Sequence, residues 1–386
     1  MADPINLDHN ATTPCLPEVI EVMAPWFGHA ANPASPHQIG RKARQALEDS
    51  RDRIAGRLGA WPDEVVFTSG ATESNQAALM GLAPPIPGKK PPTLVVSKLE
   101  HPSVATPVEL LASKGAGVVP LPVNPQGEFE PSLWTGFPEG PLLLIAHLAH
   151  HGTGAIQPVA ELVQRMVESA TDQVRSHTDA TQAVGKIRVN FHKLGVDTLA
   201  ASAHKFNGPA GIGLLLVRRS RPWAPQTVGG GQEMGRRGGT PSVALAVGMA
   251  CALDLAHDQM AARQARCLEL RRALLNRLWS TSGPLEVIGP PEGKGLAHTL
   301  LVRFPGVKAG LVVLGLDLEG VAASTGSACA SGSQRPLPGL ELVVSDDAHR
   351  REVVRLSLGH EQTLTDMESA ADRIGRVVRR LRGDRQ

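Results

Sequence analysis

Short β-rich runs alternate with helical patterns after an extended N-terminal arm, and this rhythm restricts the fold more than any other feature of the sequence. The runs occupy residues 64–68, 93–97, 117–120, 142–146, 174–178 and 198–201. Strands that alternate with helices predict an α/β fold, in which helices cover both faces of a mostly parallel sheet. Ligands of such open sheets bind beyond the carboxyl ends of the strands. We therefore expect the functional site at that edge.

The rest of the chain predicts a second, smaller unit. Residues 38–58 have helical spacing, and a long helical segment over 241–281 has a probable break near His257. Strand-like runs at 297–304 and 353–358 follow, and a last helix ends the chain. Because 386 residues exceed the usual size of one core, we expect a large domain over 1–256 and a small domain over 257–386. The N-terminal arm is counted with the large domain, although it could pack on the small one.

The charge balance argues against nucleic-acid binding. A formal net charge of +2, from 39 basic and 37 acidic residues, gives no long-range field that would gather a polyanion. The last helical pattern carries an arginine-dense stretch, which we expect to form a solvated outer face. Its members are Arg373, Arg376, Arg379, Arg380 and Arg382.

Neither a membrane nor an oxidising compartment is indicated. The apolar runs are short and interrupted, and the first residues resemble no export signal, so we expect a cytoplasmic location without a membrane partner. The four cysteines are too few and too scattered for a disulfide framework, and no C-x-x-C pair is present to hold zinc. They indicate thiols in a reducing compartment: Cys15, Cys251, Cys267 and Cys329.

Lys205 and Asp179 together indicate an aldehyde cofactor. Lys205 follows an apolar stretch and precedes a glycine-rich strand pattern, where a partly desolvated amine could form an imine. Asp179 follows the run 174–178, and its carboxylate could bind a pyridinium nitrogen. The pair points to pyridoxal 5'-phosphate (PLP), although each residue alone is more typical of a surface lysine or a helix-capping aspartate.

Two further positions fit the same cofactor. Residues 69–75 follow a strand and open a helix, so their free N–H groups and the Thr72 hydroxyl suit a phosphate, although this pattern is also ordinary helix capping. His101 follows the run 93–97 and could stack on a pyridine ring and exchange protons near neutral pH. A surface histidine is the alternative interpretation.

Ordered motifs along nearly the whole chain resemble those of the NifS/IscS kind of cysteine desulfurase, in the class V aminotransferase group. They lie at residues 7–14, 32–37, 67–75, 100–101, 179–186, 204–205, 229–233, 239–241, 325–329 and 355–359. The resemblance implies PLP fold-type I, with a mostly parallel seven-stranded sheet and a smaller α+β domain. It also implies a homodimer.

The resemblance assigns a role to each cofactor residue. Lys205 is implied to bind the aldehyde, Asp179 the ring nitrogen and Gln182 the region of the 3'-oxygen, with His101 stacked on the ring. Further contacts are implied for Ala71 and for the phosphate ligands Thr72, Ser202, His204 and Thr240 of the partner subunit.

The resemblance also implies the substrate chemistry. Arg355 pairs with the carboxylate of L-cysteine, a role that suits a planar guanidinium, and Asn32 lies close by. Lys205 and His101 move protons, and Cys329 attacks the substrate sulfur. The products are L-alanine and a persulfide on Cys329, whose sulfur passes to an acceptor protein that the sequence does not identify. Independently, Cys329 lies in a segment of small residues that is typical of an exposed loop.

One stretch departs from the family pattern. The family usually has Asn-Asn-Glu after the strand at 142–147, whereas this chain has His150, His151 and Gly152. His151 therefore replaces the asparagine that contacts the cofactor, and a neutral imidazole can still donate one hydrogen bond. His147, His150 and His151 could suggest a metal site, but no carboxylate or thiol lies at ligand spacing, so we expect none.

Two alternatives remain open. The chain could be another class V PLP enzyme, such as a selenocysteine lyase, a cysteine or cystine lyase, or an aminotransferase, which needs no persulfide-forming thiol. It could also be a catalytically weakened homologue that serves as a sulfur carrier or interaction module, as the changes at His151 and Gly152 would allow.

Overall fold

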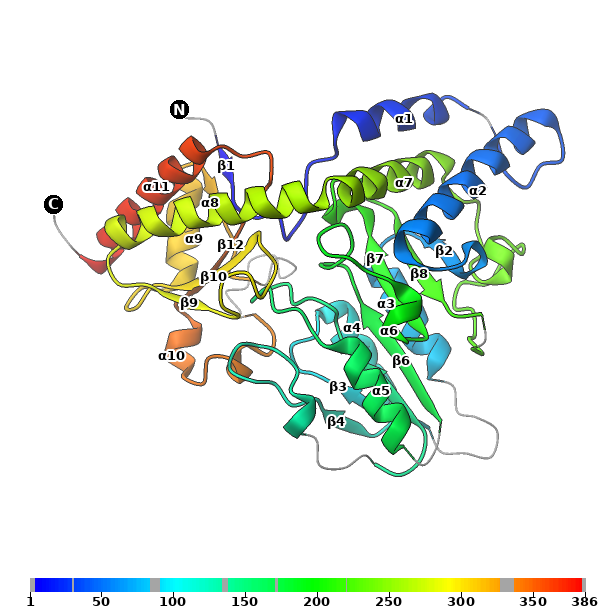
Figure 1. Cartoon of the computed structure of the whole chain (residues 1–386), viewed down its shortest axis with the longest axis horizontal. Helices are drawn as coiled ribbons and strands as arrows, with labels where there is room; N and C mark the ends of the chain where they lie inside the picture. Colours follow the sequence, from blue (N-terminus) through cyan, green and yellow to red (C-terminus); the bar gives the residue numbers. More distant parts are fainter. Residues whose placement is uncertain are drawn as a thin grey trace.

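A seven-stranded sheet forms the centre of the molecule (Figure 1). The structure is a computed structural model and describes residues 4–29, 31–83, 91–133, 138–170, 173–219, 221–326 and 337–383. The strand order is β2-β8-β7-β6-β5-β3-β4; β8 is antiparallel to both neighbours and the other pairs are parallel. The strands are β2 (Val65–Thr68), β3 (Thr93–Val96), β4 (Val118–Pro120), β5 (Leu142–Ile145), β6 (Val174–Asp179), β7 (Thr198–Ser202) and β8 (Gly213–Val217).

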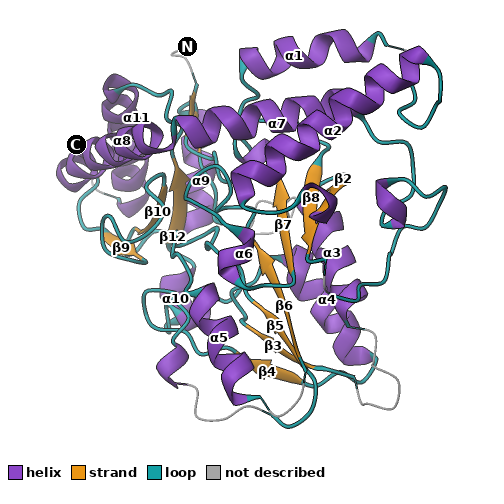
Figure 2. Cartoon of the chain, turned by 45° about the vertical axis from the view of Figure 1, so that its right-hand side comes forward, coloured by secondary structure: helices purple, strands orange, loops and turns teal. Residues whose placement is uncertain are grey.

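Helices cover both faces of this sheet because successive strand residues point to opposite sides. Phe67 of β2 packs into the core beneath four helices, α1 (Pro17–Phe27), α2 (Gln38–Leu58), α5 (Val159–Ser169) and α7 (Val243–Asp258). Its neighbour Val66 faces the other side, where α3 (Ala71–Leu82) and α4 (Pro102–Ser113) lie. The short helix α6 (Phe191–Leu194) buries Phe191 in the first of these cores. Figure 2 shows the sheet between the two helical layers.

A smaller antiparallel sheet lies beside the large one and has its own core. Its order is β12-β10-β9, and buried Leu274, Phe304 and Ile374 pack beneath it. Its elements are α8 (Met260–Thr281), β9 (Glu286–Ile288), β10 (Thr299–Arg303), α9 (Ala309–Leu318), α10 (Asp347–Arg350), β12 (Val353–Ser357) and α11 (Leu364–Arg382). Only Gln259 separates α7 from α8, so the two helices together bridge the two sheets (Figure 1).

The N-terminal arm begins on the smaller unit. β1 (Ile5–Asn6) pairs in parallel with β11 (Val321–Ala322), and the backbone of the arm then bonds to Ser357 at the end of β12. Beyond that point Thr13 bonds to the backbone oxygen of His204, next to the large sheet. The first fourteen residues therefore cross from one unit to the other at the edge where β6 and β7 end.

The fold class expected from the sequence is confirmed. Every predicted strand run coincides with a strand, and the helix break near His257 lies at Gln259. The division at residues 256 and 257 stays a prediction. Among the described helices, none is both long and apolar enough to cross a membrane.

The solvated arginine face expected for α11 is wrong in part. Arg373 is buried and donates to the backbone oxygens of Glu319 and Gly320. Arg379 donates to the Thr281 oxygen at 2.7 Å, while Arg376 pairs with the Glu319 carboxylate at the surface. The guanidinium groups of Arg373 and Arg379 thus satisfy backbone carbonyls at the ends of α9 and α8. The spacing of apolar residues along α11 does not reveal this role.

Candidate active site

A cavity of about 410 Å³ opens at the carboxyl ends of the central strands. It brings together the cofactor residues that the sequence predicted on separate motifs. They are Ala71, Thr72, His101, His151, Asp179, Gln182, Ser202, His204 and Lys205. The strand order sets their layout, because α3 begins after β2, Lys205 follows β7, Asp179 ends β6, and His151 and His101 follow β5 and β3.

Asp179 is held by donors at both carboxylate oxygens. Asn75 Nδ2 donates to Oδ2 at 2.9 Å, and the Thr181 backbone N–H donates to Oδ1 at 2.9 Å. The carboxylate is buried, and these bonds fix it at the inner end of the cavity. A fixed buried carboxylate is suited to hold a positively charged ring nitrogen.

Behind Asp179, a buried imidazole supports Asn75. His177 Nε2 lies 3.0 Å from Asn75 Oδ1, and His177 Nδ1 lies 2.9 Å from Thr198 Oγ1. Because Asn75 Nδ2 already donates to Asp179, its oxygen must accept, so His177 carries its proton on Nε2. Burial lowers the pKa of His177 to about 4, opposed by the Asp179 charge. The ring is therefore neutral at neutral pH.

His101 caps α4 and faces the cavity as a neutral ring. Its Nδ1 accepts from the Ser103 backbone N–H at 3.1 Å and lies 2.8 Å from Ser103 Oγ, so its proton lies on Nε2. Burial lowers the pKa of His101; Asp179 raises it, and Lys205 and Arg355 lower it further. Asn75 also donates to Ser103 Oγ, so one network orients both His101 and Asp179.

The start of α3 provides the anion-binding end of the cavity. Its first N–H groups, from Ala71 onward, have no partner within the helix, as at any helix N-terminus. Ser202 lies nearby, because a Cβ placed on Gly70 would be 3.9 Å from Ser202 Oγ. A Cβ on Gly213 would lie 2.6 Å from the Gly70 backbone, so β8 needs glycine there for the loop to approach.

Lys205 is held by the N-terminal arm. Its Nζ donates to the backbone oxygens of Asn10 at 2.6 Å and Ala11 at 2.8 Å. The adjacent His204 lies 3.1 Å from Thr12 Oγ1, and burial, followed by the charges of Lys205 and Lys186, lowers the pKa of His204 to about 4. The amine therefore lies between the α3 end and Asp179, as the strand order requires.

The departure from the family pattern adds a row of imidazoles beside the cavity. Ring centroids are 5.4 Å apart for His101 and His151, 4.8 Å for His151 and His150, and 5.2 Å for His150 and His147. Burial, followed by the neighbouring imidazoles and Arg355, lowers the pKa of His151 well below its usual value. No group of three or more ligands that could hold a metal occurs in the described part of the chain.

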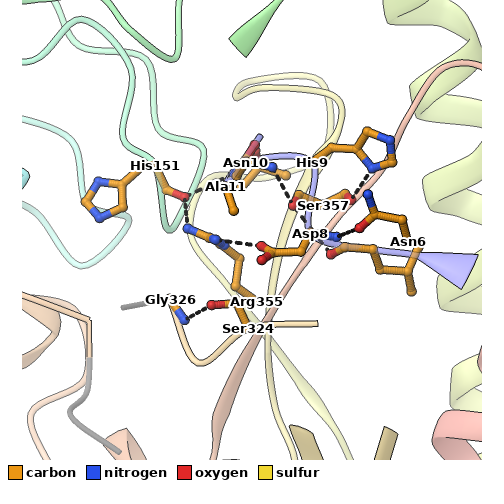
Figure 3. Close-up of polar contacts among 12 residues, drawn as sticks. Asn6, Asp8, His9, Asn10, Ala11, His151, Ser324, Gly326, Arg355 and Ser357 are labelled. Carbon is orange, nitrogen blue, oxygen red and sulfur yellow. Dashed lines mark hydrogen bonds and ion pairs between the residues drawn. The ribbon is translucent and has the colours of Figure 1, made fainter. Parts of the chain in front are cut away.

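Arg355 lies behind His151 on β12 (Figure 3). Its guanidinium donates to Asp8 Oδ1 at 2.7 Å and to the His151 backbone oxygen at 3.3 Å. Its Nε is buried without a hydrogen-bond partner among the described residues. A buried N–H without an acceptor is costly, so one hydrogen bond of this guanidinium is left unsatisfied among the described residues.

Four predicted site residues are not among those that line this cavity, and Arg355, described above, is one of them. Asn32 lies in the loop after α1, where its side chain accepts from the Ala34 N–H, and it does not line the cavity. Thr240 is exposed before α7 and does not line it either. Cys329 lies outside the described residues. The roles of these four residues stay predictions, as do those of the residues that line the cavity.

The sequence interpretation missed several supporting residues. Asn75, Ser103 and His177 fix Asp179 and His101, while Asn10 and Asp8 fix Lys205 and Arg355. Asn75 lies one helical turn after Ala71, a spacing that places both side chains on the same face of the helix. Nothing local to Asn10 or Asp8 indicates their partners, which are more than 190 positions away.

The donor set fits pyridoxal phosphate. An amine lies between a carboxylate fixed by Asn75 and a helix N-terminus that glycine keeps open to an anion. An imidazole with its proton on the outer nitrogen faces the same space. The amine matches the aldehyde of the cofactor, and the carboxylate matches its ring nitrogen. The helix N-terminus matches the phosphate, and the imidazole matches the face of the ring.

Comparison with known proteins agrees with this geometry. The Aminotransferase class-V family model matches residues 5–369. The cysteine desulfurase IscS of Dictyoglomus turgidum is 36% identical over 380 residues, which cover 98% of this chain and 95% of that protein. A solved NifS-like protein superposes with a TM-score of 0.90 at 30% identity, covering 98% of this chain and 100% of that one.

A second solved structure, of SspA in complex with cysteine, gives a TM-score of 0.79 at 30% identity and covers 93% of this chain and 100% of that one. The family match spans nearly the whole sequence, and the relatives are matched along nearly their full length. This chain belongs to the class V aminotransferase family and, within it, to the NifS/IscS-like cysteine desulfurases.

Proposed function

We propose that this protein converts L-cysteine to L-alanine and transfers the sulfur to Cys329 as a persulfide. The observation that carries the proposal is the single cavity in which Lys205, Asp179, His101 and the start of α3 converge. The relative solved in complex with cysteine supports the choice of substrate. The desulfurase names of the full-length relatives support the reaction.

Homologues in this family are pyridoxal phosphate enzymes, and the donor set suits that group. When bound, PLP accepts the electron pair released at the substrate Cα and so eases cleavage of the C–S bond. Asp179 holds the ring nitrogen in its charged form, which strengthens this electron withdrawal. The N–H groups at the start of α3, with Ser202 and His204, hold the phosphate.

Two residues of the cavity move protons. The Lys205 amine, held by the Asn10 and Ala11 carbonyls, takes the proton from the substrate Cα. His101 carries its proton on Nε2 and can donate it toward the departing sulfur. Because the pKa of His101 is lowered and its Nδ1 accepts from Ser103, the ring is an uncharged donor at neutral pH.

Arg355 binds the substrate carboxylate. Its Nε is buried and unpaired in the described structure, and the ion pair with Asp8 fixes the guanidinium plane. A carboxylate at Nε completes the donor set of the side chain. Asn32 is a second candidate contact, and in a dimer it could reach the cavity of the partner copy.

The sulfur acceptor residue is Cys329. Ser324, three positions before the segment 327–336, pairs with Arg355 through backbone bonds. A Cβ on Gly326 would lie 2.7 Å from Leu337, so the described residues on the two sides of that segment lie close together. Cys15, Cys251 and Cys267 are less suited, because burial raises the pKa of each thiol.

We further propose a homodimer and an acceptor protein for the persulfide sulfur. Thr240 is exposed on a loop that also exposes Val228 and Met234, which are 84% and 52% accessible. Exposed apolar side chains beside a predicted phosphate ligand are typical of an interface. Thr240 would then complete the phosphate site of the partner copy. A cytoplasmic location stays a prediction.

Product analysis of the holoenzyme tests the proposal. Wild-type protein supplied with L-cysteine and a thiol reductant should release alanine and sulfide in equal amounts, and Cys329→Ala should lose this turnover. Borohydride reduction followed by peptide mass mapping should place the cofactor on Lys205. Pyruvate and ammonia as products would indicate a lyase instead, and protein that takes up no PLP would indicate a non-catalytic homologue.

A further inference from the structure

Lys205 lines two cavities. The second has a volume of about 220 Å³ and lies between the large sheet and the start of α8. Lys186 lines the second cavity but not the first, while Gln182 lines the first but not the second. The Lys186 Nζ donates to Gln182 Oε1. These side chains therefore form part of the wall between the cavities, with the Lys205 amine beside them.

The orientation of the Gln182 amide is determined by its two partners. Gln182 Nε2 donates to the Asn10 backbone oxygen at 3.0 Å, and Lys205 Nζ donates to the same oxygen at 2.6 Å. A carbonyl oxygen can only accept, so Nε2 must face Asn10 and Oε1 must face Lys186. Without the Lys186 donor, Oε1 would be buried without its hydrogen bond, and the amide could rotate.

The backbone is built to place Lys186 there. Gly185 has φ +77°, and a Cβ at that position would lie 2.5 Å from Phe206 Cβ, so only glycine allows this turn. The Lys186 backbone oxygen accepts from Gln264 Nε2 of α8 at 2.6 Å. The residue is thus fixed from the large sheet on one side and from α8 on the other.

In the described part of the chain, no carboxylate pairs with Lys186. The groups that line its cavity are Lys205, Arg263, Cys267, His9, His298, His360 and Glu361, and Glu361 pairs with His9. Burial, followed by the Lys205 charge, lowers the pKa of Lys186 well below its usual value. Lys186 is half-buried, and partial burial of an amine without a counter-charge is unfavourable, so filling space alone does not explain a lysine here.

We propose that Lys186 is a positioning residue that locks the amide of Gln182 beside the Lys205 nitrogen. This inference rests on the proposed function, because Gln182 is the predicted neighbour of the cofactor 3'-oxygen. Nε2 has a second N–H beyond the one given to Asn10, and in the locked amide this donor can face the 3'-oxygen, which favours the unprotonated state of the nitrogen that Lys205 contributes to the cofactor linkage. The lock therefore sets the pH at which that linkage loses its proton.

The test is a spectroscopic titration of the holoenzyme. The cofactor bound to Lys205 should absorb near about 400 nm, and the pH midpoint of this band reports the protonation of the linkage. Lys186→Met keeps the length of the side chain but removes the donor, so the midpoint should rise by about one pH unit. The variant should bind PLP stoichiometrically and be at least as stable to heat as wild type.

A double-mutant cycle separates positioning from general charge. Gln182→Leu should raise the midpoint by a similar amount, and the double variant should shift it no further than the larger single change. Arg263→Met removes a cation from the same cavity without touching Gln182, and it should leave the midpoint in place. Lys186→Arg, which keeps a donor, should restore most of the wild-type value.

An unchanged midpoint in Lys186→Met would overturn the inference, as would additive shifts in the cycle or an equal shift in Arg263→Met. If Lys186→Met does not fold, Gln182→Leu provides the test instead. A wild-type pH midpoint in Gln182→Leu would then overturn the inference. The proposed function fails independently, when wild-type protein itself gives no alanine or no band.

Discussion

Arg355 is the proposed substrate ligand, and its hydrogen bonds define what a carboxylate would have to contact. Two of its donors are used by Asp8 and His151, and the buried Nε remains for a ligand oxygen. We predict that Arg355→Lys raises the KM for L-cysteine by about 10- to 100-fold with a smaller change in kcat, because a lysine cannot reproduce the planar donor set. Steady-state alanine release measures both constants.

Arg303 on β10 provides a matched control for this change. It is also a nearly buried arginine of the small sheet, but it pairs with Glu286 and Glu352, away from the cavity. Arg303→Lys should leave the KM within about twofold of wild type. Equal KM values for Arg355→Lys and wild type would remove Arg355 from the substrate site.

His151 is where this chain differs most from its family, and its effect should depend on pH. At neutral pH the buried ring is uncharged, so His151→Asn should keep kcat/KM within about threefold at pH 8. In acid, a proton on either His151 or His101 opposes one on the other, since their centroids are 5.4 Å apart. Activity falls as these rings gain protons.

At a pH below the pKa values of both rings, log kcat/KM should therefore fall with a slope of about two in wild type and about one in the variant. The measurement is a pH profile of alanine release between about pH 4 and 8 on PLP-saturated enzyme. A profile identical to wild type, or a variant that cannot hold PLP, would contradict this account of His151.

At the residue scale, the sequence predicted the site residues that lie in recognisable motifs. It missed the residues whose only connection to the site is a contact with a partner distant in sequence. Lys205, Asp179 and His101 follow strand runs, so the topology rule alone places them at one edge. The supporting roles of Asn75 and His177 could not be predicted, because their hydrogen-bond partners are about 100 positions away in the sequence. Cys329 was predicted from its loop context, and its role stays a prediction.

At the scale of elements, β8 and α3 meet at a contact that tolerates no side chain. A Cβ on Gly213 would lie 2.6 Å from Gly70 and 2.8 Å from the Ala201 oxygen, and both neighbours are backbone. We predict that Gly213→Ala pushes the start of α3 outward, lowers PLP affinity at least about tenfold and destabilises the fold by about 1–3 kcal/mol. Cofactor titration and urea unfolding measure the two effects.

Gly56 in α2 is the control, because a Cβ there meets nothing within 4 Å. Gly56→Ala should bind PLP like wild type and gain about 0.5–1 kcal/mol of stability from helix propensity. If Gly213→Ala binds PLP as tightly as Gly56→Ala, then the close approach of β8 does not shape the anion site.

Strand and helix positions were predictable because periodicity is local, whereas strand direction was not. The glycine-rich run that forms β8 looks in sequence like the parallel strands of the sheet, yet it is antiparallel to both of its neighbours, β2 and β7. The pairing of β1 with β11 also joins segments more than 300 residues apart, and two residues carry no periodic signal. Arg373 on α11 was misjudged for the same reason, since its carbonyl partners belong to α9.

For the whole molecule, the N-terminal arm explains why the site depends on both units. Asn10 accepts from Lys205 through its backbone, while its side chain bonds to the His151 oxygen and to Thr299 at the start of β10. The next residues of the arm bond to His204. Movement of the small sheet would therefore shift the Asn10 carbonyl and the Lys205 amine together, so substrate binding at Arg355 is mechanically linked to the amine.

Neutral buried imidazoles make the whole fold sensitive to mild acid. The pKa of His177 is lowered from 6.5 to about 4 by burial, so between these values the unfolded chain binds a proton that the folded chain does not. Stability is then complete above about pH 6.5 and falls as the pH approaches 4, by about 3 kcal/mol for this residue. His150, His151 and His298 act in the same direction. Glu361, whose pKa is lowered to about 2, adds a loss only below about pH 4.5.

Urea midpoints measured from about pH 7 down to 4.5 should therefore fall steadily. His177→Gln should flatten this slope even if it is less stable at pH 7, whereas the exposed His29→Gln should not. Parallel slopes for wild type and His177→Gln would show that the buried ring is not the group that acid titrates.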